Sequence, residues 1–294
     1  MDEWFNYYRF LRNGKTLELP EAYPYSRYIQ WLEEQPIEES LQYWRSYLAD
    51  YEELATIPSP SNRNRKLEEY SYGELSLTFS ESETAQLRAA ADRHRVTLSN
   101  LFLAAWGLVL GRYNGTEDVV FGNVVSGRPT EVPGVERMVG LFINTVPVRV
   151  KLSDTETFAE LMKKLQQESL MSQSNHYCPL VDIQAQSPLK QQLFDHIVVF
   201  ENYPLEEVAY SVDFDLGFDI KEASVSEQTN YDFNLSVETG QRLTITLSYN
   251  QNVYSPETVE RVKGHLHSVL TQASVKPDQR ITEYDLLTAE ETNY

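Results

Sequence analysis

Two apolar segments joined by a loop rich in glycine and proline constrain the fold of this chain most. Val119, Val120 and Phe121 form a short run of β-branched and aromatic residues, which is typical of a buried strand. A second apolar stretch covers residues 138–150 and ends in alternating valines. Glycines between the two allow the backbone to approach a neighbour or ligand closely. The segment 119–150 therefore predicts two strands whose connecting loop belongs to a site.

The rest of the chain mixes helical and strand patterns without strict alternation. Aromatic residues at helical spacing predict helices at residues 3–12 and 25–50, the second broken at Pro36. Ser80 and Glu83 form a capping box that opens another helix. Further helices are expected at residues 100–113, from residue 154 or 155 onward, and from residue 255 onward. Strands are expected at residues 72–78, 197–200, 212–220, 231–237 and 243–249. This order predicts an α/β two-layer sandwich with a mixed β-sheet.

Composition excludes several classes of protein. The net charge of −19 argues against nucleic acid as a partner, because binding to phosphates needs clustered Lys and Arg. The densest basic group, Arg63, Arg65 and Lys66, is interpreted as a solvated loop within a linker at residues 58–66. The longest apolar run, residues 101–110, is too short to span a membrane. A single cysteine, Cys178, and the lack of a secretory pattern are consistent with the cytoplasm.

The five histidines offer little for catalysis or metal binding. His196 follows Asp195, but no serine or cysteine in a nucleophile elbow accompanies the pair. His176 precedes Cys178 by two residues, in a loop where an unreactive cysteine is the favoured interpretation. His265 and His267 are expected on different faces of a helix, which disfavours a shared metal. We expect structural roles for these side chains, and phosphate-binding glycine loops are absent from the sequence.

Several motifs occur together in a recognisable order. Gly127-Arg128-Pro129 follows the first strand, and residues 138–145 read Met-Val-Gly-Leu-Phe-Ile-Asn-Thr. These segments resemble the C-terminal half of condensation domains from nonribosomal peptide synthetases. Other blocks agree over nearly the whole chain: Pro24-Tyr25 with Tyr28 and Trp31-Leu32, Gln42-Tyr43-Trp44, Ser99 to Gly107, Phe194-Asp195-His196 and Glu201-Asn202-Tyr203-Pro204.

The resemblance implies a fold and a place within a larger domain. It implies a chloramphenicol-acetyltransferase-like fold, of which a condensation domain contains two copies. The family carries a His-His-x-x-x-Asp-Gly motif, whereas this chain has no His-His pair. We therefore expect the C-terminal, acceptor-side lobe, with the catalytic motif upstream of Met1 and no catalytic residue within the chain. Residues 1–57 would be a helical linker and first helices, 58–284 the lobe, and 285–294 the start of a linker to an adenylation domain.

The resemblance also implies an activity and partners. A whole condensation domain joins a donor thioester to the amine of an acceptor aminoacyl thioester, both held on the phosphopantetheine arms of carrier proteins. The expected partners are the N-terminal lobe, donor and acceptor carrier proteins and an adenylation domain, with no cofactor or metal bound directly. The lobe alone is expected to be inactive. Its expected contributions to the substrate tunnel are Ser126, Gly127, Arg128, Pro129 and Asn144.

Alternatives remain open at the level of sequence. A non-catalytic module that only docks carrier proteins would share these motifs, and an epimerization domain would share the fold with a more acidic loop at residues 126–129. Arg128 could instead brace its own loop through a local salt bridge. A second element that crosses to the other lobe, a latch, is expected between Asn202 and Tyr231.

Overall fold

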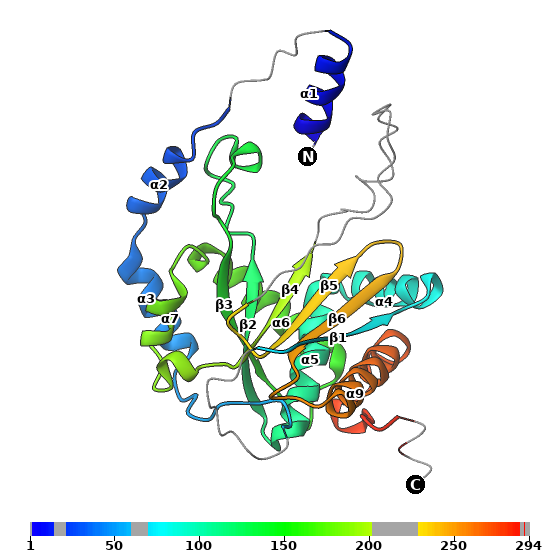
Figure 1. Ribbon diagram of the computed structural model, residues 1–294. Helices are drawn as coiled ribbons and strands as arrows, with labels where there is room; N and C mark the ends of the chain where they lie inside the picture. Colours follow the sequence, from blue (N-terminus) through cyan, green and yellow to red (C-terminus); the bar gives the residue numbers. More distant parts are fainter. Residues whose placement is uncertain (1, 15–21, 60–69, 202–228, 289–290, 292–294) are drawn as a thin grey trace. The chain divides into compact units, whose positions relative to one another are not determined.

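A computed structural model describes residues 2–14, 22–59, 70–201, 229–288 and 291 of the 294-residue chain (Figure 1). The chain divides into two compact units, and each is described on its own. The smaller unit comprises Met1–Glu34, Arg128–Leu141 and Asn202–Thr229. The larger unit comprises Gln35–Gly127, Phe142–Glu201 and Asn230–Tyr294.

In its described residues, the smaller unit has two helices and a loop that packs against aromatic rings. The helices are α1 (Asp2–Arg12) and α2 (Ser26–Glu33). In α2 the ring of Tyr28 stacks on Trp31, with centroids 5.9 Å apart. The loop that follows Gly127 packs closely against Tyr23, which precedes α2. A Cβ on Gly134 of this loop would lie 2.4 Å from the Tyr23 ring. Glycine is therefore required where this loop packs against the segment before α2.

The larger unit is organised around one six-stranded mixed sheet in the order β1-β6-β5-β4-β2-β3. The central pairs β2·β4 and β4·β5 are parallel, and the outer pairs β2·β3, β5·β6 and β1·β6 are antiparallel. Parallel pairs require crossover connections, and the connection from β2 to β4 contains helices. The strands are β1 (Tyr72–Thr78), β2 (Asp118–Val125), β3 (Asn144–Lys151), β4 (His196–Glu201), β5 (Phe233–Thr239) and β6 (Leu243–Asn250).

Four helices share the main hydrophobic core with one face of the sheet. They are α4 (Glu81–His94), α5 (Leu98–Asn114), α6 (Phe158–Ser172) and α9 (Pro256–Val275). Helix α5 is buried along most of its length, and a Cβ on its Gly107 would meet Val150 of β3 at 2.6 Å. The absence of a side chain at Gly107 thus lets the most apolar helix lie directly on the sheet.

The opposite face of β2, β3 and β4 carries a second, smaller core. Helices α3 (Ile37–Tyr47) and α7 (Leu180–Ala185) pack there around the fully buried Trp44. Alternation along β2 divides its side chains between the two cores, because Val119 and Phe121 belong to the first and Val120 to the second. Both faces of this part of the sheet are therefore covered.

Most expected elements are present, and the predicted α/β fold with a mixed sheet is confirmed. The helix expected from residue 154 or 155 was placed too early. It begins at Phe158, because Thr157 and Glu160 form its capping box. The apolar stretch 138–150 was also too long for a strand, since pairing with β2 starts only at Asn144.

Three expectations cannot be followed in the structure. The strand at 212–220, the latch between Asn202 and Tyr231 and the basic linker around Arg63 lie wholly or mostly outside the described residues. Among the residues that are described, no helix combines the length and apolarity needed to cross a membrane.

Candidate functional site

The loop after β2 is held by a close backbone approach at Gly127. This residue has φ of +59°, and a Cβ placed on it would lie 1.8 Å from the carbonyl oxygen of Phe142. Only glycine fits both the left-handed conformation and this contact. The chain leaving β2 is therefore fixed against the chain that enters β3, as the close-approach interpretation of the sequence predicted.

Arg128 folds back onto its own loop within the smaller unit. Its Nη1 donates to the carbonyl oxygen of Met138 at 3.1 Å and also to that of Val135. These bonds join the two ends of the segment 128–138 and brace it. The sequence left open that Arg128 braces its own loop through a local salt bridge. The structure shows bonds within this loop, and their acceptors are carbonyl oxygens. Ser126 is exposed, and Pro129 is partly exposed.

Asn144, the first residue of β3, organises a neighbouring turn in the larger unit. Its Nδ2 donates to the carbonyl oxygens of His176 at 2.8 Å and Cys178 at 2.7 Å. Its Oδ1 accepts from the backbone N–H of Thr145 at 2.9 Å. The side-chain amide of Asn144 therefore connects the turn at residues 176–178 to the start of β3.

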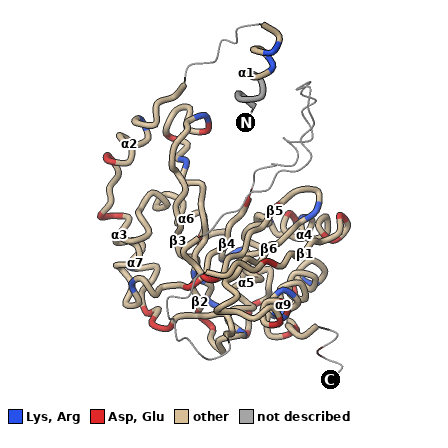
Figure 2. Tube along the Cα trace, viewed as in Figure 1, with Lys and Arg blue, Asp and Glu red and all other residues tan. Residues whose placement is uncertain are grey.

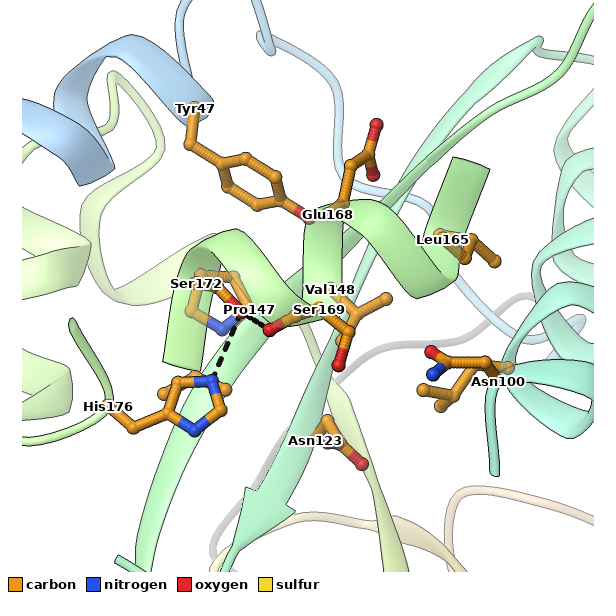
Figure 3. A pocket seen from close by; sticks show the side chains of 12 residues that line it. Tyr47, Asn100, Asn123, Pro147, Val148, Leu165, Glu168, Ser169, Ser172 and His176 are labelled. Atoms are coloured by element: carbon orange, nitrogen blue, oxygen red, sulfur yellow. Dashed lines mark hydrogen bonds between the residues drawn. The ribbon is translucent and has the colours of Figure 1, made fainter. Parts of the chain in front are cut away.

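A small cavity of about 30 Å³ lies beside this turn, between α3, α5, α6 and the ends of β2 and β3 (Figure 3). His176 reaches it from one side and Asn100 from the opposite side. A cavity of this size has room for water but not for an acyl chain. The lining residues are Tyr47, Asn100, Leu103, Asn123, Val146, Pro147, Val148, Leu165, Glu168, Ser169, Ser172 and His176.

The polar groups around the cavity form a structural arrangement. Nε2 of His176 lies 3.1 Å from Oγ of Ser172, whose hydroxyl donates to the carbonyl of Ser169 at 3.0 Å. Burial lowers the pKa of His176 to about 4, so the imidazole is neutral at pH 7. The Ser172 hydroxyl thus contacts both the Ser169 carbonyl and the His176 ring, which holds the imidazole at the end of α6.

Two further groups at the cavity are shielded from water. Burial raises the pKa of Glu168, although Lys164 acts in the opposite direction. The Oδ1 atom of Asn123 is buried and has no hydrogen-bond partner among the described residues. An acceptor of this kind next to a polar cavity is satisfied by an ordered water in most proteins.

His196 and Cys178 are both unsuited to catalysis. The Nε1–H of Trp106 donates to Nε2 of His196 at 3.0 Å, and Nδ1 of His196 lies 2.8 Å from Oδ1 of Asp195. Both ring nitrogens of this fully buried histidine are thus engaged inside the core. Cys178 is also buried, and its burial raises the pKa of the thiol to about 12. The structural roles expected for both side chains agree with this geometry.

The structure therefore brings together only part of the predicted site. Gly127 and Asn144 both act at the start of β3, whereas the contacts of Arg128 lie within the smaller unit. Ser172, the partner of His176, was not predicted from the sequence. Their four-residue spacing across the end of α6 was the available signal. Among the described residues, no cluster of three or more His, Cys, Asp or Glu side chains could hold a metal.

Comparison with known proteins identifies the family. The condensation domain family matches residues 1–294. This chain belongs to the condensation domain family. Condensation domains of this type occur in the synthetases of peptide antibiotics, and the match confirms the family that the motifs at residues 127–145 indicated.

Curated relatives of this condensation domain are much longer proteins. Bacitracin synthase 3 of Bacillus licheniformis is 41% identical over 99% of this chain, which spans 5% of the relative. Surfactin synthase subunit 3 of Bacillus subtilis (strain 168) is 41% identical over the whole chain and 23% of its own length. Tyrocidine synthase 3 of Brevibacillus parabrevis is 40% identical over 97% of the chain and 4% of the relative.

Solved structures share the fold at low sequence identity. The first condensation domain of the calcium-dependent antibiotic synthetase has a TM-score of 0.76 and 18% identity, over 97% of this chain and 64% of that chain. The X-domain from teicoplanin biosynthesis has a TM-score of 0.75 and 20% identity, over 97% of this chain and 69% of that one. These neighbours are consistent with the chloramphenicol-acetyltransferase-like architecture expected from the sequence.

Proposed function

We propose that this chain forms the C-terminal, acceptor-side lobe of an amide-forming condensation domain. In the assembled domain, the amine of an acceptor aminoacyl thioester attacks the carbonyl carbon of a donor thioester. The new C–N bond replaces the C–S bond, the amine loses a proton, and the donor's phosphopantetheine thiol is released. Both substrates would arrive on the phosphopantetheine arms of carrier proteins.

One observation carries this proposal, namely two exposed apolar side chains in the loop of the smaller unit that contains Arg128. Val139 and Leu141 are 92% and 77% exposed, while the preceding Met138 is 2% exposed. Apolar side chains gathered at the surface mark protein interaction sites. This chain covers 64% of the solved condensation domain of the calcium-dependent antibiotic synthetase, so about a third of that domain has no counterpart here. A second lobe is the proposed cover for this segment.

The division of labour follows from the residues present. The chain has no His-His pair, and its His176 and His196 are engaged in structural contacts. The second lobe would therefore supply the histidine that manages the proton during attack. This lobe would supply part of the tunnel through Ser126, Gly127, Arg128, Pro129 and Asn144. Alone it would be inactive.

The proposed domain limits and partners complete this assignment. Residues 58–284 would form the lobe, preceded by helices at 1–57 and followed at 285–294 by the start of a linker to an adenylation domain, in the cytoplasm. Lys and Arg are scattered among Asp and Glu along the larger unit (Figure 2). Because the chain has a net charge of −19, acidic carrier proteins would need local basic and apolar docking patches.

The proposed lobe contact can be tested by binding. The N-terminal lobe of the same synthetase would be produced as a separate polypeptide and titrated with this chain. Burial of Val139 and Leu141 is worth about 1.5–3 kcal/mol each, so the V139S/L141S variant should bind at least ~10-fold more weakly. Val275→Ser is the matched control, because Val275 is 62% exposed at the end of α9. Equal affinities for both variants and the wild type would contradict the assignment of this segment as the interface.

Arg128 tests the proposed tunnel. Arg128→Ala would be assayed in the assembled domain for turnover, and in this chain for unfolding by urea. Reduced turnover at unchanged lobe affinity is expected if the braced loop shapes the tunnel. Unchanged turnover together with unchanged stability would remove Arg128 from the site.

A further inference from the structure

The segment that begins at Tyr284 is held on α9 by several hydrogen bonds. Gln272 donates through Nε2 to the carbonyl of Asp285 at 2.7 Å, and its Oε1 accepts from the backbone N–H of Asp285 at 3.1 Å. Ser268 donates to the same carbonyl at 2.9 Å. Leu286 packs against the main core. The chain from Tyr284 onward therefore follows the surface of α9 in a defined register.

A helical turn begins where this segment passes Gly264. Thr288 donates to Oε2 of Glu291 through its backbone N–H and its hydroxyl, both at 2.9 Å, and its Oγ1 accepts from the N–H of Glu291 at 3.3 Å. This reciprocal pair is a capping box. A Cβ on Gly264 would lie 2.8 Å from Cγ2 of Thr288. The turn can thus rest on α9 only because position 264 has no side chain.

His265 connects this turn to the centre of the lobe. Its Nε2 lies 3.0 Å from Oε2 of Glu291, and its Nδ1 lies 2.6 Å from the hydroxyl of Tyr113 at the end of α5. The side chain of His265 is 11% exposed, whereas that of Glu291 is 28% exposed, so the histidine is the buried partner of this pair. One carboxylate therefore caps the turn and accepts from the histidine at the same time, which couples formation of the turn to its docking.

We propose that α5 and α9 form a docking site for residues 284–288 and Glu291 of the same chain, with His265 as its positioning residue. The site has three elements: the gap at Gly264 that admits Thr288, the pair of His265 with Glu291, and the bonds of Gln272 to Asp285. The segment is thereby an integral part of the lobe surface. Any polypeptide joined to it would be anchored on α9. This inference stands on contacts within the larger unit and does not depend on the proposed function.

Hydrogen–deuterium exchange of the full 294-residue chain tests the docking site. The amide hydrogens of Asp285, Thr288 and Glu291 are hydrogen-bonded only while the segment is docked or capped. His265→Ala should increase their exchange rate at least ~10-fold, which corresponds to losing about 1.4 kcal/mol of local protection. Exchange in β4 and β5 should stay unchanged, which confirms that the core is folded.

Two further variants make the result specific. Gly264→Ala should release the segment through contact with Thr288, although alanine is a better helix former and should not weaken α9 itself. His267→Ala is the matched control, since the His267 ring packs on Phe79 with centroids 5.1 Å apart. Segment exchange should remain at the wild-type rate in H267A. Wild-type exchange in both H265A and G264A, or equal acceleration in H267A, would overturn the proposal.

Discussion

Arg149 on β3 is buried and forms a two-point ion pair with the partly exposed Asp118 on the neighbouring strand β2. Nε donates to Oδ1 at 2.9 Å and Nη2 to Oδ2 at 2.6 Å. The third nitrogen, Nη1, donates to the carbonyls of Tyr47 and Ala49, both at 2.7 Å. One guanidinium thus joins two strands to the end of α3, in a geometry that the planar fork of arginine allows and lysine does not.

Loss of this arginine should be costly. Arg149→Ala leaves the Asp118 carboxylate and two carbonyls without their donor, so we expect a loss of about 3–5 kcal/mol in the free energy of unfolding, measured with urea. Arg149→Lys should recover only part of this. Lys164→Ala provides the comparison, because its contact with Glu156 is 3.4 Å long and partly exposed and should be worth at most ~1 kcal/mol. Similar losses for R149A and K164A would contradict the bridging role.

Gly127 and Gly115 form a matched pair of left-handed glycines. Gly127→Ala adds a Cβ that would meet the carbonyl oxygen of Phe142, whereas at Gly115, with φ of +62°, nothing lies within 4 Å of the added atom. Gly115→Ala should therefore cost only about 1 kcal/mol for its conformation. Gly127→Ala should cost at least ~3 kcal/mol, because the backbone must also move. Equal midpoints in thermal unfolding would show that the loop is not held at Gly127.

Asn144 should act through its two donor hydrogens. Asn144→Asp preserves the shape but turns a carboxylate toward the carbonyls of His176 and Cys178, which it cannot bond. We expect N144D to lose about 2–4 kcal/mol of unfolding free energy and N144A about 1–3 kcal/mol. Hydrogen exchange should locate the effect in the turn 173–180. A larger loss in N144A than in N144D at pH 7 would argue against this account.

The buried imidazole of His176 predicts a pH dependence of stability. Burial lowers its pKa from 6.5 to about 4, so the unfolded chain binds a proton between these values while the folded chain does not. The contribution of His176 is fully present above pH 6.5 and is lost as the pH falls toward 4. The total change is about 3 kcal/mol.

The histidine contribution must be separated from that of a carboxylate. Burial raises the pKa of Glu168 on the same cavity, and this group favours the folded state as the pH falls. Urea unfolding at several pH values would therefore be compared between the wild type and His176→Gln. The free energy of unfolding of H176Q, relative to that of the wild type, should rise by about 1 kcal/mol for each pH unit below 6.5. A difference that is independent of pH would contradict the assignment of a neutral buried imidazole.

Local signals in the sequence were sufficient for most elements of the fold. Ser80 with Glu83 starts α4, and Ser255 with Pro256 starts α9, because caps are read from neighbouring residues. Alternation along residues 243–249 likewise identifies β6. The strand order β1-β6-β5-β4-β2-β3 was not accessible, since it depends on long-range pairing between segments with similar patterns.

The candidate site shows the same limit. The requirement for glycine at residue 127 followed from the Gly-Arg-Pro step, because a turn leaves a local mark. The bonds of Asn144 to the turn at His176 join residues 32 positions apart, and the contact of Trp106 with His196 spans 90 positions. No local pattern encodes such pairs. For this reason a structural role could be expected for His196, whereas its partner Trp106 could not be identified from the sequence.

The central claim is best tested by an amide-bond assay with loaded donor and acceptor carrier proteins. The assay would be run with this chain alone, with the N-terminal lobe alone, and with both polypeptides together. The account predicts dipeptidyl product only when both lobes are present, with loss of product when the V139S/L141S variant replaces this chain at low lobe concentration. Product from this chain alone would contradict the account. So would the absence of product from folded, associated lobes, which would instead identify a docking module without catalytic function.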